Sequence, residues 1–142
     1  MVSQKLRRWR DRGAAAVEFA IIVPALVILI FGSIEFGLAV NARTMVGNAA
    51  REGVRVASLE GSTAPGPADI QTATQNAVSG LPGTPTITVT CVSKTGGTCT
   101  IGTDGAAQGV ATVTVQLAYT GITGMFPFLN GNITASSTMR IE

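Results

Sequence analysis

The sequence predicts an α+β protein in which a long N-terminal helix packs on a small antiparallel sheet. Residues 14–40 form a nearly uninterrupted apolar run. Beyond it, apolar residues recur every three or four positions up to about residue 59, as on one face of a helix. The second half of the chain is rich in threonine and valine and alternates with period two, which is typical of strands.

The predicted helix begins with a membrane span preceded by a basic leader. Residues 1–13 contain five basic residues and one acidic residue, and Phe19 to Ile34 contains no charge. A helix over residues 14–40 is about 40 Å long, enough to cross a bilayer. Pro24 is tolerated in such a helix. The positive-inside rule predicts a single-pass protein of the inner (cytoplasmic) membrane, with the leader in the cytoplasm and the chain after Val40 outside.

Two carboxylates border the apolar run. Glu18 lies near its start and Glu35 near its far end, where we expect the side chain to reach the membrane interface. A charge at the centre of a membrane helix costs roughly 2.5 kcal/mol or more, so an acid in such a run indicates a function beyond anchoring. The alternative for Glu18 is a carboxylate solvated by lipid headgroups.

Residues 41–60 are predicted to continue the helix with one apolar face. No helix breaker follows Val40, so a single helix can run from Ala14 to about Leu59. The alternative is two helices separated by a bend near residues 37–41. Small residues dominate the apolar stripe, which we expect to pack on the sheet: Ala42, Met45, Val46, Ala49, Gly53, Val56 and Ala57.

Residues 61–142 are predicted to form one extracytoplasmic domain. A Pro/Gly-rich loop at 61–67 precedes a short helix capped by Asp69 and ending near Ser79. The sheet is predicted to have three or four strands, at residues 86–92, 98–101, 110–119 and 133–141. The apolar loop at 121–131 either covers the core or forms a contact patch.

The composition argues against catalysis. The chain of 142 residues has no histidine, the commonest general base and zinc ligand, and no paired carboxylates stand out. We therefore expect no enzyme activity, cofactor, metal or small-molecule substrate. The basic residues concentrate in the leader, so they give no support for nucleic-acid binding.

The two cysteines, Cys91 and Cys99, lie in a Thr/Gly-rich segment predicted to be outside the cytoplasm. An even number of cysteines in that compartment favours one disulfide. The alternative is two free thiols at the ends of a hairpin.

The segment Arg12-Gly-Ala-Ala-Ala-Val-Glu-Phe19 resembles the class III signal of type IV pilin-like proteins. With Pro24, Glu35-Phe-Gly, the run Asn48-Ala-Ala-Arg-Glu-Gly-Val-Arg55 and the ending Ser-Thr-Met-Arg-Ile-Glu142, the chain more closely resembles TadE-like proteins, minor pseudopilins of tight-adherence (Flp) pilus systems. The resemblance implies a type IV pilin-like fold. It also implies pilus assembly and adhesion as the setting, with other pilins and the assembly platform as partners.

The resemblance also implies a processing site. A prepilin peptidase would cut after Gly13, so that Ala14 becomes the N-terminus, Glu18 the fifth residue and Phe19 the sixth. The new amine lies one helical turn from Glu18 and can pair with this carboxylate or with that of a neighbouring subunit. In apolar surroundings both groups are costly when unpaired, so pairing would set the register of an added subunit.

Two alternatives stay open at this stage. One is a single-pass anchored domain with no filament function. The other is a secreted protein cut after Ala42 by ordinary signal peptidase, since Val-Asn-Ala is a passable small-residue site. The first residue of the mature protein separates them: Ala14 for the pseudopilin, Met1 or Val2 for the anchored domain, and Arg43 for the secreted protein.

Overall fold

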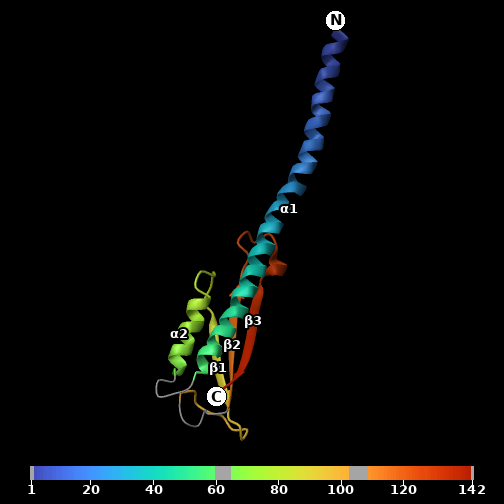
Figure 1. Ribbon diagram of the computed structural model, residues 1–142. Helices are drawn as coiled ribbons and strands as arrows, with labels where there is room; N and C mark the ends of the chain where they lie inside the picture. The colour runs from blue at the N-terminus through green and yellow to red at the C-terminus, as the bar shows by residue number, and fades with distance from the viewer. Residues whose placement is uncertain (1, 60–64, 103–108, 142) are drawn as a thin grey trace. The chain divides into compact units, whose positions relative to one another are not determined.

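The computed structural model describes residues 2–59, 65–102 and 109–141, with side chains from residue 13 onward. The chain forms helix α1 (Val2–Ala57), helix α2 (Pro67–Ala77) and strands β1 (Thr86–Val92), β2 (Val110–Tyr119) and β3 (Gly131–Arg140) (Figure 1). A short 3-10 helix, η2 (Pro127–Leu129), lies between β2 and β3. The chain divides into two compact units, Met1–Gly37 and Leu38–Glu142.

Helix α1 is one continuous helix, as one of the two predicted alternatives requires. It runs through residues 37–41 without interruption, so the alternative of two separate helices is wrong. It begins at Val2 rather than at Ala14, because lysine, arginine, leucine and glutamine in the leader are good helix formers. Pro24 is accommodated inside it.

Helix α2 begins three residues earlier than predicted. Pro67 occupies its first position and Gly66 is the N-cap, so Asp69 stands in the first turn rather than at the cap. The Asp69 carboxylate still stabilises the start of the helix, because its Oδ2 accepts a hydrogen bond from the N–H of the N-cap residue Gly66 at 2.9 Å. The predicted loop at 61–67 lies largely outside the described residues.

The sheet has the order β1-β2-β3, and both neighbouring pairs are antiparallel. Val113 of the central strand stands opposite Val89 on one side and Ser137 on the other. The stretch 98–101, predicted as a possible fourth strand, contributes only an isolated bridge between Val92 and Thr98. Within the described residues the sheet therefore has three strands.

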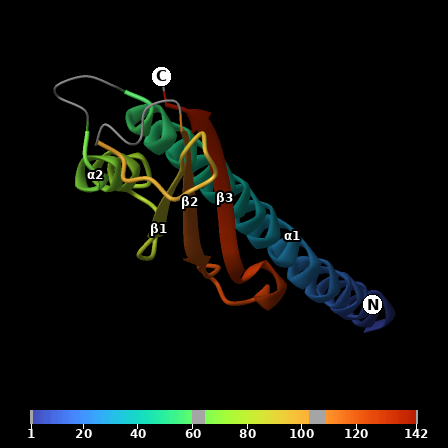
Figure 2. The same cartoon turned by 90° about the horizontal axis from the view of Figure 1, so that it is seen from below.

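The core lies between one face of the sheet and the two helices (Figure 2). The predicted alternation of β2 is confirmed, since Ala111, Val113, Val115, Leu117 and Tyr119 are all buried. The second half of α1 covers these residues with small side chains: Val46, Ala49, Ala50, Val54 and Ala57.

The buried arc of α1 differs in part from the predicted stripe. Ala50 and Val54 are buried, whereas Met45 and Val56 are only half-buried. The buried arc is wider because α1 contacts two elements. At Gly53, an added Cβ would meet both Val113 of β2 and Thr74 of α2. The helix is thus packed on two sides, and its buried arc is wider than a single sheet contact would require.

The opposite face of the sheet is polar and uncharged over most of its area. Its threonine and serine hydroxyls pair across the strands, Thr112 with Thr138 at 3.2 Å and Thr114 with Ser136 at 3.1 Å. Such cross-strand pairs stabilise the register of an antiparallel sheet.

The loop between β2 and β3 does not serve mainly as a cover for the core. Ile122, Met125 and Phe128 are exposed, and only Phe126 and Leu129 are half-buried. Of the two predicted alternatives, the contact patch therefore fits these three side chains.

Candidate functional site: the apolar helix and its processing segment

The first part of α1 presents its apolar side chains outward. The helix residues 13–57 are long and apolar enough to cross a membrane, and none of the most apolar stretch is buried. Large exposed side chains occur all around it: Val17, Phe19, Ile21, Ile22, Leu26, Leu29, Phe31 and Ile34. An apolar surface of this extent is unfavourable in water and is compatible with a single membrane anchor.

The four residues of the predicted processing site lie together at the start of this apolar surface. Gly13, Ala14, Glu18 and Phe19 are exposed residues of α1. Ala14 and Glu18 are four residues apart, so they lie on the same face one turn from each other. Cutting after Gly13 would therefore place an amine beside the only carboxylate between Gly13 and Ile34. The side chains of the preceding leader lie outside the described ones.

The side chain of Glu35, which we expect to reach the membrane interface, is buried in the structure. Its side chain is 1% exposed, the most buried charged residue for which the structure gives an exposure. Burial of a carboxylate is costly unless other groups compensate for it, so Glu35 is part of the protein interior. In the sequence, Glu35 is an isolated acid in an apolar run, and this pattern alone does not predict that its side chain is buried.

The run Asn48-Ala-Ala-Arg-Glu-Gly-Val-Arg55 divides into a packing half and a solvent half. Ala49, Ala50, Gly53 and Val54 are buried, whereas Arg51 and Arg55 are exposed. At Gly53, α1 approaches both α2 and β2 closely, because a Cβ there would meet Thr74 Oγ1 and Val113 Cγ1. The small residues of this run therefore serve packing.

The charged residues of the same run form an ion pair on the surface. Arg55 donates two hydrogen bonds to Glu52, from Nη2 to Oε1 at 2.7 Å and from Nε to Oε2 at 3.0 Å. The hydrogen bonds from Arg55 lower the pKa of the Glu52 carboxyl. The pair is open to solvent, so its contribution to stability is small.

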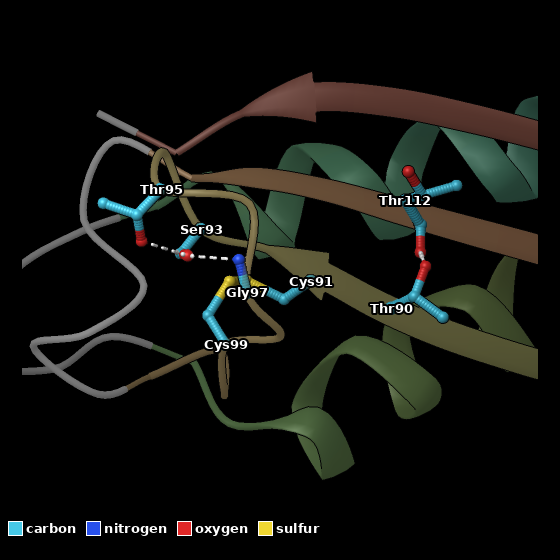
Figure 3. Close-up of a disulfide and its surroundings, with 7 residues drawn as sticks. All are labelled: Thr90, Cys91, Ser93, Thr95, Gly97, Cys99 and Thr112. Carbon is cyan, nitrogen blue, oxygen red and sulfur yellow. Dashed lines mark hydrogen bonds between the residues drawn. A yellow bond between two sulfur atoms is a disulfide. The ribbon is translucent and has the colours of Figure 1, made fainter.

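The predicted disulfide joins Cys91 of β1 to Cys99, with the two Cα atoms 5.0 Å apart (Figure 3). Two free thiols, the alternative, do not occur. The intervening turn is closed by Ser93, whose N–H donates to Gly97 O at 2.7 Å and whose Oγ accepts from the Gly97 N–H at 3.2 Å. Gly96 adopts a φ of 89°, which a side chain would disfavour. The turn brings the two cysteines within bonding reach.

In the described parts of the chain, the two remaining acidic residues, Asp69 and Glu52, each have a local partner. Asp69 accepts a hydrogen bond from the Gly66 N–H and Glu52 pairs with Arg55, whereas Glu60, Asp104 and Glu142 lie outside the described residues. In the part of the chain that the structure describes, no group of three or more His, Cys, Asp or Glu residues is placed to hold a metal ion.

The apolar stretch of α1 from Gly13 and the small-residue run that follows it are also the part of the chain that resembles a known family. The TadE-like protein family matches residues 13–55. This match confirms the resemblance drawn from the Gly13–Phe19 signal and the Asn48–Arg55 run. The segment lies wholly within α1, so α2 and the sheet fall outside the match. No curated protein and no solved structure matches the chain.

Proposed function

We propose that this protein is a non-catalytic, membrane-anchored pseudopilin that assists the assembly of Flp pili, and so surface attachment. The observation that carries the proposal is that the TadE-like match begins at Gly13, the residue after which the processing signal would be cut. The match then covers both the outward-facing apolar stretch and the packing run at Asn48–Arg55.

In this proposal a prepilin peptidase on the cytoplasmic side removes residues 1–13. The apolar helix then stays in the membrane, and the sheet domain lies outside the cytoplasm. The Cys91–Cys99 disulfide supports this orientation, because disulfides persist mainly in oxidising compartments.

Glu18 is the residue that we propose for subunit contact. Its side chain is exposed, so it is accessible to a neighbouring helix. In a bundle of apolar helices, pairing between Glu18 and the Ala14 amine of another subunit would satisfy both charges and define the stagger between the helices. The partners are thus the other pilins and the assembly platform.

The mature N-terminus tests the processing step. Co-expression with an aspartic prepilin peptidase should shorten the chain by the 13 residues of the leader, so that it begins at Ala14. Gly13→Val should prevent the cut. Gly37→Val is the matched control, since both glycines have open space around a built Cβ and only Gly13 precedes the proposed cleavage point.

The other outcomes have distinct meanings. A mass that the peptidase leaves unchanged, with Met1 or Val2 first, contradicts processing and favours a plain anchored domain. A chain beginning at Arg43 indicates secretion after cleavage by ordinary signal peptidase. That cut would remove Ala42, whose side chain is fully buried.

A further inference from the structure

The connection between β2 and β3 exposes an unusual amount of apolar surface. Residues 120–130 contain no charged residue. Ile122 is 74% exposed, Phe128 78% and Met125 51%. Large apolar side chains grouped in this way on a short segment mark an interaction surface rather than a solvent-facing loop.

The loop is held in a defined conformation by its own hydrogen bonds. Asn130 Oδ1 accepts from the Gly121 N–H at 2.7 Å, which ties the two ends of the loop together. Within it, the Leu129 N–H donates to Phe126 O at 2.9 Å, and the Phe126 and Phe128 rings pack edge to face with centroids 5.8 Å apart. The apolar side chains are thus presented by an ordered scaffold.

The loop lies at the end of the sheet from which α1 enters the domain. Gly53 of α1 stands against Val113 of β2, and the two elements run in opposite directions (Figures 1 and 2). From Val113 to Tyr119 the strand advances about 20 Å. The antiparallel helix covers that length in about 13 residues, which leads back to about Val40. The loop after Tyr119 therefore lies level with the exposed residues Leu38 and Val40.

Leu38 and Val40 follow the proposed membrane span by only a few residues. A hydrocarbon core of about 30 Å needs about 20 helical residues. Counted from Ala14, it ends near Ile34, so Leu38 and Val40 fall in the outer headgroup layer. Aromatic and aliphatic side chains are favoured at that depth.

We propose that Ile122, Met125 and Phe128 insert into the outer leaflet of the bilayer and form a second membrane contact of the sheet domain. The inference rests on the anchoring in the proposed function. A lipid surface fits because the loop is uncharged, exposes both aromatic and aliphatic side chains, and stands level with Leu38 and Val40, which follow the span closely in the sequence.

Depth-dependent quenching tests the insertion. In the full chain reconstituted in phosphatidylcholine vesicles, Trp9→Phe removes the only native tryptophan. Phe128→Trp then introduces a single probe on the loop. In vesicles of brominated phosphatidylcholine this probe should lose most of its fluorescence, and its emission should be blue-shifted. Ile122→Trp repeats the measurement at a second exposed position if the first variant does not fold.

Two further probes make the result specific. Thr95→Trp lies in the turn after β1, at the opposite end of the sheet because Val92 pairs with Val110, and it should not be quenched. Phe31→Trp lies in the apolar stretch and should be quenched whether or not the loop inserts. Quenching at residue 31 with none at 128 or 122 overturns the inference and leaves the anchor intact. Absence of quenching at residue 31 contradicts the anchor itself. A blue shift at 128 without quenching indicates a protein contact, such as a second copy, and also overturns the inference.

Discussion

Gly53 of α1 and Thr74 of α2 approach so closely that a Cβ at residue 53 would collide with Thr74 Oγ1. Thr74 has no room to move, because its side chain is fully buried and its hydroxyl donates to Ile70 O at 2.6 Å. Val113 Cγ1 would lie 3.0 Å from the same Cβ, so the strand closes the site from the other side.

Gly53→Ala should therefore destabilise the domain, although alanine favours helices. Overpacking costs about 1–3 kcal/mol, whereas replacing a helical glycine gains up to about 1 kcal/mol. We expect a lower melting temperature for the sheet signal in circular dichroism of the detergent-solubilised full chain.

Gly47→Ala is the matched control for this substitution. Gly47 lies in the same helix with open space around a built Cβ, so alanine there should stabilise the chain slightly. Thr74→Ala should partly rescue Gly53→Ala, because it removes the colliding hydroxyl and leaves the tight contact with Val113 Cγ1. Equal melting temperatures for the two glycine variants would contradict the close approach.

The disulfide should stabilise the turn after β1. Replacing Cys91 and Cys99 by serine should lower the free energy of unfolding by about 2–3 kcal/mol, as for a short closed loop. Reductant should have a similar effect on the native chain and none on the double serine variant. Peptide mapping under non-reducing conditions should find the Cys91–Cys99 link in envelope-derived protein. Two free thiols there would contradict the pairing.

Glu18→Ala should separate assembly from insertion. The variant should still insert, because its span is more apolar, and should still be cut, because Gly13 is unchanged. Pilus output and crosslinking to other pilins should fall. Unchanged pilus output would remove Glu18 from assembly and favour a plain anchored domain.

Burial in the structure decides which substitution is a suitable control for Glu18→Ala. From sequence, Glu35→Ala is the natural comparison, since both residues are carboxylates at the ends of the span. Glu35 is buried, however, so its loss would disturb the fold. Val17→Ala, an exposed neighbour of Glu18, is the appropriate control, and it should leave pilus output unchanged.

The Glu52–Arg55 pair gives a measurable titration. Because the folded-state pKa of Glu52 is lowered, the pair stabilises the fold above the ordinary pKa of glutamate, and this contribution is lost as the pH falls through the lowered value. Carboxyl NMR titration of the full chain should show the lowered pKa. Arg55→Gln should raise it toward the ordinary value. Arg51→Gln, which removes the neighbouring exposed arginine, should not.

The period-two pattern of β2 could be predicted from the sequence because burial on a sheet alternates strictly with residue number. The same holds for the apolar helix after Gly13, since its length and composition alone are those of a helix that can cross a membrane. The predicted ends of α2 and β3 differ from the observed ones by a few residues. Asp69 is a good N-cap residue, but Pro67 is restricted to helix-compatible φ and begins the helix earlier.

The sequence by itself determined the outward-facing apolar helix, its continuation into a small-residue packing run and the cysteine pair, because these features depend on local composition and periodicity. Only the tertiary structure decided that Glu35 is buried, that Gly53 stands between Thr74 and Val113, and that Ile122 and Phe128 face outward beside the start of the domain. These properties arise where residues distant in the chain meet, and no local pattern specifies which element lies on the other side.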